Sequence, residues 1–308
     1  NHINCLFIDI NNNLWIGTLT GGLNVMVNGS DEVTRTYTNK TYAFPEVRAI
    51  FQDSKQNIWL LTSQQGIFIK YTHSKEFVKF ETDAYKQNPK FFTALSAINE
   101  DINGNIWISS FMGGIAIYNP QWKTMQFFKE DMPVPQSICG NSIRAIYRDK
   151  TGNMWLCSHG GGISIYSPIA SSISTYARSP YKNSVPGNIV SCFQEDADGS
   201  MYIGTDGAGF SLFNPKKQSF TNFGIKDGFS SDAILDIKEI KPGILAIASW
   251  NGALNIYNTK TKKIDKYSFK AKKTNTVALN IYGMYFDKKE KENPLITFLV
   301  SIILFRLA

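Results

Sequence analysis

Residues 101–118 read Asp-Ile-Asn-Gly-Asn-Ile-Trp-Ile-Ser-Ser-Phe-Met-Gly-Gly-Ile-Ala-Ile-Tyr, and variants of this stretch recur through the chain. The Asn-Gly pair at 103–104 is typical of a tight turn, because both residues tolerate a positive φ. The run Ile-Trp-Ile at 106–108 favours a strand, and Gly-Gly at 113–114 marks a second turn before apolar residues resume. The stretch therefore predicts a pair of linked β-hairpins.

The tryptophan at position 107 marks a site that repeats along the sequence. Its equivalents are Trp15, Trp59, Trp155, Tyr202 and, in a degenerate copy, Ala246. An aspartate stands six residues before every anchor except the last, at Asp9, Asp53, Asp101, Asp149 and Asp196. The repeat length of about 46 residues is in the range of propeller blades. With an apolar strand upstream and a fourth run downstream, each repeat holds the four short strands of one blade.

These repeats predict an all-β fold, a β-propeller of four-stranded blades with six recognisable blades and the start of a seventh. We expect a seven-bladed parent protein, of which residues 1–287 form a partial propeller. The seventh copy fails at Asn293, where the repeat has its anchor, and Pro294 follows. We therefore interpret residues 288–308 as a non-repeat C-terminal tail at a truncated or frame-shifted end. A short membrane-associated end and a distorted last strand are the alternatives, since the apolar run is shorter than the roughly 20 residues that span a bilayer.

Composition excludes disorder, and the distribution of charge argues against a nucleic-acid face. With 43% hydrophobic and 13% aromatic residues the chain fills a core, which excludes disorder. The net charge of +7 comes almost entirely from a lysine-rich segment at 260–292. We interpret this segment as a solvated edge, because a nucleic-acid face would spread basic residues among stacking aromatics. The four cysteines have neither a disulfide framework nor a metal-binding spacing.

The residues that catalysis would need are scarce. His2, His73 and His159 are the three histidines, and no nucleophile elbow, phosphate loop or His-Glu-x-x-His pattern is present. The recurrent aspartates hold the same turn position in every copy, so we assign them to hydrogen bonding of the turn backbone. The recurrent tryptophans fall in a buried strand pattern and are assigned to packing between blades. The sequence therefore predicts a protein that is not an enzyme, with no cofactor and no metal site.

The pattern Asp-x-x-Gly-Asn-hydrophobic-Trp-hydrophobic-Gly/Ser-Thr/Ser-x-x-Gly-Gly-hydrophobic resembles the two-component regulator propeller repeat, over roughly residues 1–287. The resemblance implies a fragment of the periplasmic sensor region of a Bacteroidetes hybrid two-component system histidine kinase. It implies carbohydrate sensing, with an oligosaccharide as ligand and signal transduction to a kinase that is absent from this chain.

The same resemblance implies the partners and the location. The parent protein would be anchored in the inner membrane, and this fragment would be attached to the membrane only through the missing parts. Its partners would be a second propeller and the downstream signalling domains, and the resemblance also allows a dimer of the parent. No nucleic acid is expected to bind this fragment.

Ligand-binding residues are expected where the copies differ. In a propeller blade the turn between the second and third strands shares a face with the crossing to the next blade, and here that turn precedes the Gly-Gly position. Residues there offer stacking or directional hydrogen bonds to a sugar: Gln64, Phe111, His159, Asp206, Trp250 and Asn251. Arg48 and Arg144, on first strands, would add cationic contacts to an acidic sugar. Relaxed constraint on loops is the competing explanation of this variation.

Two other functions stay open. The repeats also resemble those of secreted propeller lyases of the streptogramin-inactivating kind, which would need a histidine with acidic partners on one face. His159 is the histidine at such a position. A protein-interaction scaffold is the third reading, because propellers bind peptides on the same surface.

Overall fold

A computed structural model describes residues 2–30, 32–33, 35–37, 44, 46–130, 137–179, 183–270, 277–278, 281–286, 296–300 and 304–307. By its internal contacts the chain divides into two compact units. Unit 1 comprises Asn1–Leu156 and Ile165–Ser174, and unit 2 comprises Cys157–Ser164 and Thr175–Ala308. Across the ranges just given, no helix is both long and apolar enough to cross a membrane.

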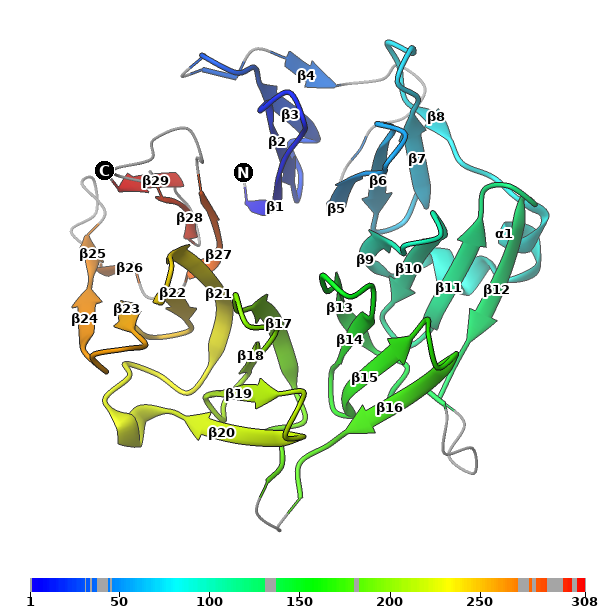
Figure 1. Ribbon diagram of the computed structural model, residues 1–308. Helices are drawn as coiled ribbons and strands as arrows, with labels where there is room; N and C mark the ends of the chain where they lie inside the picture. The colour runs from blue at the N-terminus through cyan, green and yellow to red at the C-terminus, as the bar shows by residue number, and fades with distance from the viewer. Residues whose placement is uncertain are drawn as a thin grey trace. The chain divides into compact units, whose positions relative to one another are not determined.

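Most of the strands fall in six four-stranded antiparallel sheets, and in each sheet the strands pair in chain order (Figure 1). We call these sheets blades one to six. Their strands are β1 (Ile3–Ile8), β2 (Leu14–Thr18), β3 (Leu23–Met26) and β4 (Arg35–Tyr37); β5 (Val47–Gln52), β6 (Ile58–Thr62), β7 (Ile67–Lys70) and β8 (Val78–Lys79); β9 (Leu95–Glu100), β10 (Ile106–Ser110), β11 (Gly114–Asn119) and β12 (Thr124–Phe128); β13 (Ile143–Arg148), β14 (Met154–Ser158), β15 (Gly162–Ser167) and β16 (Ser172–Tyr176); β17 (Val190–Glu195), β18 (Met201–Thr205), β19 (Phe210–Asn214) and β20 (Ser219–Phe223); and β21 (Ile234–Lys241), β22 (Ile244–Ser249), β23 (Leu254–Asn258) and β24 (Ile264–Tyr267). The predicted all-β fold of four-stranded blades is confirmed, while the seven-bladed parent stays a prediction.

The first strands of successive blades lie next to each other within each unit. In unit 1, β1, β5, β9 and β13 contact one another in this order, and in unit 2, β17 contacts β21. The segment after blade six adds the short strands β25 (Phe269–Lys270) and β26 (Val277–Ala278), and then a three-stranded sheet of β27 (Ile281–Phe286), β28 (Ile296–Val300) and β29 (Leu304–Leu307). Strand β27 contacts β21. Positions 287–295 and 301–303, including Asn293 and Pro294, lie outside the described residues, so the boundary at residue 287 stays a prediction.

The anchor tryptophans fill the space between blades. Trp107 is 2% exposed and shares a core cluster with Ile143, Ile146 and Met154 of the next blade. In the same way, Trp59 packs in a cluster with Leu95 and other residues of blade three. The predicted packing role of the tryptophans is therefore confirmed. A buried indole removes about 150 to 250 Å² of surface from water, so each of these rings stabilises the packing between blades.

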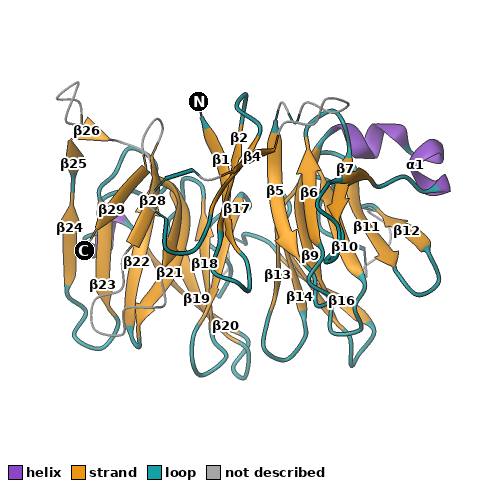
Figure 2. Cartoon of the chain, turned by 90° about the horizontal axis from the view of Figure 1, so that it is seen from above, coloured by secondary structure: helices purple, strands orange, loops and turns teal. Residues whose placement is uncertain are grey.

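One insertion departs from the repeat. Helix α1 (Asp83–Gln87) and the 3-10 helix η1 (Pro89–Thr93) join β8 to β9, and Figure 2 shows α1 in purple. Phe92 is buried, and the Tyr85 ring stacks on it with centroids 4.3 Å apart. The other short 3-10 helix of the described chain, η2 (Ile225–Asp227), follows β20. The repeat pattern predicted no helix, because residues in an inserted loop obey local packing and not the blade period.

Candidate functional site

Two predicted ligand-binding turns of unit 2 are held by a single residue. His159, after β14, forms an isolated antiparallel bridge with Ile189. Asp206, after β18, donates its backbone N–H to the carbonyl of the same Ile189 over 2.8 Å. Ile189 directly precedes β17, so it belongs to the linker that enters blade five. The turns of blades four and five are therefore brought together at this linker.

The third turn of unit 2 joins the series in the same manner. Gly207 donates its backbone N–H to the carbonyl of Asp232 over 3.1 Å, and Trp250 donates to the carbonyl of Ala233 over 2.8 Å. Asp232 and Ala233 are consecutive residues of the linker into blade six. The turns that carry His159, Asp206 and Trp250 therefore follow one another along one end of unit 2.

The side chains at these turns are open to solvent. His159, Asp206 and Asn251 are exposed, and Trp250 is 41% exposed. Asn251 has a φ of +52°, a conformation that asparagine tolerates better than most residues. The carbonyl of Trp250 accepts a hydrogen bond from Oγ of Ser231 over 2.8 Å, which fixes the backbone of the turn. Unit 2 thus offers an indole, an imidazole, a carboxylate and an amide on one rim.

Unit 1 holds the other four predicted residues. Gln64 and Phe111 are exposed in the equivalent turns of blades two and three, and Phe111 donates its backbone N–H to Ala94 over 2.8 Å. Arg48 on β5 is exposed, but its guanidinium lies 2.5 Å from the Glu46 carboxylate. Its charge is therefore largely offset by Glu46. Arg144 is half-buried on β13.

An asparagine or aspartate at the blade entry positions these turns. The carbonyl of Asn188 accepts the backbone N–H of Gly162 over 3.0 Å, and its Oδ1 accepts that of Arg178 over 2.5 Å. Asn141 does the same for Gly114 and Glu130, at 2.8 and 2.7 Å. The signal for this role was present in the sequence, because Asn141 and Asn188 stand eight residues before the aspartate of their repeats, but no function was attached to it.

The opposite end of each blade carries the recurrent aspartate. Oδ1 of Asp101 accepts the backbone N–H groups of Asn103 and Asn105 at 2.8 and 2.9 Å. Its Oδ2 accepts hydrogen bonds from Nδ2 of Asn105 at 2.8 Å and from Nε1 of Trp107 at 2.9 Å. The carboxylate is fully used by its own turn. The predicted structural role of this aspartate is confirmed.

The electrostatics of the equivalent turn in blade four follow from the same bonds. Burial raises the pKa of the Asp149 carboxyl, but hydrogen bonds from Trp155, Asn153 and Thr151 outweigh burial and hold the pKa below its ordinary value. In blade five the anchor is Tyr202, whose hydroxyl donates to Oδ2 of Asp196 over 3.2 Å. Burial of the ring, together with the Asp196 carboxylate, raises the pKa of Tyr202 above its ordinary value, so the phenol stays protonated at any physiological pH.

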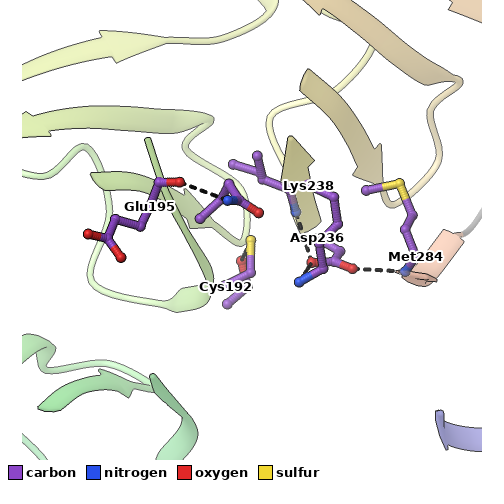
Figure 3. A network of polar contacts seen from close by, with 8 residues as sticks. Cys192, Glu195, Asp236, Lys238 and Met284 are labelled. Atoms are coloured by element: carbon purple, nitrogen blue, oxygen red, sulfur yellow. Dashed lines mark hydrogen bonds and ion pairs between the residues drawn. The ribbon is translucent and has the colours of Figure 1, made fainter. Parts of the chain in front are cut away.

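A partly buried polar network joins blade six to β27 (Figure 3). Oδ2 of Asp236 accepts the backbone N–H of Met284 over 2.8 Å, and Nζ of Lys238 lies 3.4 Å from Oδ1 of Asp236. The Asp236 carboxylate raises the pKa of Lys238 above its ordinary value, against the opposing effect of burial. Burial, with a smaller contribution from Asp236, raises the pKa of the Cys192 thiol to about 12. Cys192 is therefore a protonated, unreactive packing residue and not a nucleophile.

The described part of the chain contains neither a disulfide nor a cluster of side chains that could bind a metal ion. The four cysteines, all among the described residues, form no disulfide. Among the residues described, no group of three or more His, Cys, Asp or Glu side chains is placed to hold a metal ion.

The repeated four-stranded blades and their shared linkers define an all-β protein of the β-propeller class. Residues 1–20, 137–160 and 184–207 match the family model described as two component regulator propeller. These segments open blades one, four and five, so the repeats of these three blades match the two-component regulator propeller model. No curated protein matches the chain in sequence.

Several solved structures share the fold. The extracellular domain of a hybrid two component system from B. thetaiotaomicron is 22% identical, with a TM-score of 0.72, and the match covers 97% of this chain and 39% of that one. Virginiamycin B lyase from Staphylococcus aureus is 14% identical, with a TM-score of 0.72 and coverage of 97% and 92%. PorZ of Porphyromonas gingivalis, a surface component of the type-IX secretion system, is 18% identical, with a TM-score of 0.61 and coverage of 96% and 42%. The chain thus spans less than half of the hybrid two component system structure that it matches.

Proposed function

We propose that this chain is a ligand-sensing propeller from the extracytoplasmic part of a hybrid two-component system, and that its ligand is an oligosaccharide. The observation that carries the proposal is the match of three blades to the two-component regulator propeller family. The shared fold with extracellular domains of such systems supports it. The chain would bind the ligand, and a kinase outside this sequence would carry the signal.

The chemistry of the turns supports a sugar as the ligand. Trp250 offers an exposed ring for the apolar face of a pyranose, while Asp206, His159 and Asn251 offer directional hydrogen bonds to hydroxyl groups. In unit 1, Phe111 and Gln64 offer the same combination. Arg48, already paired with Glu46, and Arg144 would contribute to binding if the sugar is acidic.

The location and partners follow from the same proposal. A sensor of this class would work in the periplasm, as part of a parent protein anchored in the inner membrane. Its partners would be a second propeller and the downstream signalling domains of that parent. The proposal also allows the parent to form a dimer. The chain itself would not be an enzyme.

Calorimetric titration with a panel of neutral and acidic oligosaccharides tests the proposal. Trp250→Ala and Asp206→Ala should each weaken binding by about 1 to 3 kcal/mol, the scale of one lost stacking contact or charged hydrogen bond. Ile10→Ala is the matched control, because Ile10 is 66% exposed on an Asp turn at the opposite blade end. Unchanged binding in both variants, or a loss of affinity in the control alone, would place the ligand elsewhere.

A second candidate is a lyase of the streptogramin-inactivating kind. Its specific support is that the backbones of the His159 turn and the Asp206 turn both contact Ile189, so a histidine and an acidic residue lie on adjacent turns. A lyase of this fold was solved as an inactive variant with quinupristin. Incubating the chain with quinupristin and following the drug by chromatography tests this candidate. Consumption by the native chain and not by His159→Ala would favour it, and an unchanged drug would count against it.

A further inference from the structure

A cleft of about 520 Å³ opens at the outer side of blade three, within unit 1. Its walls are β11 and β12 of blade three, and β15, the turn before β16 and the start of β16 in blade four. Asp101 and Asn105 line it, so it lies at the Asp-turn end, and the strand β10 separates it from the Phe111 turn. A volume of this size is ordinary for a small-ligand site.

The floor of the cleft is apolar and rigid. Ile115, Ile117 and Ile173 line it together with two aromatic rings. Those rings belong to Trp107 and Tyr166, whose centroids lie 5.2 Å apart. Trp107 is itself fixed by its hydrogen bond to Asp101. A ligand would therefore meet a preformed surface and would not have to order it.

Trp122 stands at the rim with an unusually open ring. It is 71% exposed, although large apolar side chains are normally shielded from water. Its backbone is fixed, because Oδ1 of Asn119 accepts the N–H groups of Gln121 and Trp122, both over 2.9 Å. Nδ2 of Asn119 donates in turn to Oδ1 of Asn105 over 2.8 Å.

The turn itself does not require a tryptophan. Asn214 and Asn258 cap the same hairpin in blades five and six, where they accept the N–H groups of Lys217 and Thr261 at the position equivalent to Trp122. A lysine and a threonine thus serve the turn equally well. The hairpin therefore forms without an indole at this position, so the structure of the repeat does not explain the presence of Trp122.

The polar side chains of the lining are neutral, except for one carboxylate whose oxygens are already hydrogen-bonded. Thr124 and Gln126 on β12, with Ser171 and Ser172 across the cleft, make no side-chain hydrogen bond to another described residue. Asp101 is the one carboxylate of the lining, and its two oxygens already accept four hydrogen bonds. No lysine or arginine lines the cleft in the part of the chain described.

We propose that this cleft is a second carbohydrate site, which binds a neutral sugar residue. The apolar face of the sugar stacks on Trp122, and its hydroxyl groups exchange hydrogen bonds with Gln126, Thr124 and the two serines. An amide and three hydroxyls can both donate and accept, which suits hydroxyl groups, while the lack of an available charge disfavours uronic acids. The site is separate from the turns of the proposed sensor function and does not depend on them.

Titration of the full chain with cellohexaose, maltohexaose, xylohexaose and the acidic hexagalacturonate tests the proposal, with tryptophan fluorescence and calorimetry as readouts. At least one neutral hexasaccharide should bind. Trp122→Ala should weaken that binding about tenfold, and Gln126→Ala about threefold, since each removes one contact. Trp122→Ala should cause the same loss in a Trp250→Ala background, in which the proposed turn site is disabled, and this result would separate the two sites.

Ile169→Ala is the matched control, because Ile169 is 90% exposed in the neighbouring hairpin but does not line the cleft. All variants should melt at the temperature of the native chain. Binding that Trp122→Ala leaves intact would overturn the proposal. So would a panel in which no hexasaccharide binds at millimolar concentration, or in which only the hexagalacturonate binds.

Discussion

The indole Nε1 of Trp107 donates a hydrogen bond of 2.9 Å to Oδ2 of Asp101, six residues earlier in the chain. The same bond joins Trp15 to Asp9 and Trp59 to Asp53, each over 2.8 Å. It ties the turn at one end of the blade to the ring that packs against the next blade. The most regular residues of the sequence therefore serve the fold, and the candidate binding residues lie where the repeat is irregular.

Replacing Asp101 should destabilise the chain strongly. In Asp101→Ala the indole N–H of Trp107 and the backbone N–H of Asn105 lose their acceptor in a buried site, which costs about 2 to 3 kcal/mol. Urea denaturation followed by circular dichroism measures the loss. Asp83→Ala, at a side chain that is 95% exposed, is the control and should change the free energy of unfolding by less than about 0.5 kcal/mol. Equal effects in the two variants would contradict the structural role.

The turn of blade four should make stability depend on pH in the acid range. The pKa of Asp149 lies below its ordinary value in the folded chain, because its hydrogen bonds outweigh burial. The folded state therefore binds this proton less readily than the unfolded state. The stabilisation is complete above the ordinary aspartate pKa of about 3.9 and is lost as the pH falls through the folded value.

Trp155→Phe isolates one bond of that turn, since it removes the N–H that donates to Asp149 over 2.9 Å. The difference in free energy of unfolding between the native chain and this variant should be largest near neutral pH and should shrink below about pH 4. Urea denaturation at a series of pH values gives the curve. A difference that grows on acidification would contradict the assignment.

Two glycines of blade five allow the cost of a positive φ to be distinguished from the cost of a steric clash at an added Cβ. Gly209 and Gly199 have φ values of +81° and +83°, so an alanine is strained at both. A Cβ at Gly209 would lie 2.0 Å from the carbonyl oxygen of Phe223, whereas a Cβ at Gly199 would meet nothing within 4 Å. Gly199→Ala should cost about 1 kcal/mol and Gly209→Ala clearly more, measured as a fall in Tm. Similar costs would show that the blade relaxes around the new methyl group.

The sequence allowed the blades to be predicted because their signals are local and periodic. Asn103-Gly104 turns, the Ile106-Trp107-Ile108 strand and their copies all fall within strands or turns of the structure. The helical insertion was missed, since α1 carries no buried residue and therefore has no apolar period to detect. Its partner η1 is held by Phe91 and Phe92, which resemble any apolar pair in the sequence.

The candidate sites were predictable to different degrees. The turn positions of His159, Asp206 and Trp250 followed from the repeat, and the structure shows the linker residues that join them in unit 2. The cleft at Trp122 was not predicted. Its walls come from equivalent hairpins of two blades, and the repeat pattern shows that such hairpins exist but not which side chains share a cavity.

The contact between Asp236 and Met284 allows a test of how blade six is joined to β27. Asp236 occupies a position that is alanine or cysteine in the other blades, as at Ala97 and Cys192, so the repeat does not require a carboxylate. Its Oδ2 accepts the buried N–H of Met284, and its Oδ1 accepts that of Ile237 at 2.9 Å. Asp236→Ala should therefore remove about 1 to 3 kcal/mol of stability, because two backbone donors lose an acceptor.

Lys238→Met should cost less, since the lysine side chain is 37% exposed and Asp236 keeps both backbone bonds. Urea denaturation of the two variants under identical conditions measures the order, and hydrogen exchange at the Met284 amide should accelerate in Asp236→Ala alone. A larger loss in Lys238→Met would show that the ion pair, and not the bond to Met284, joins the two strands.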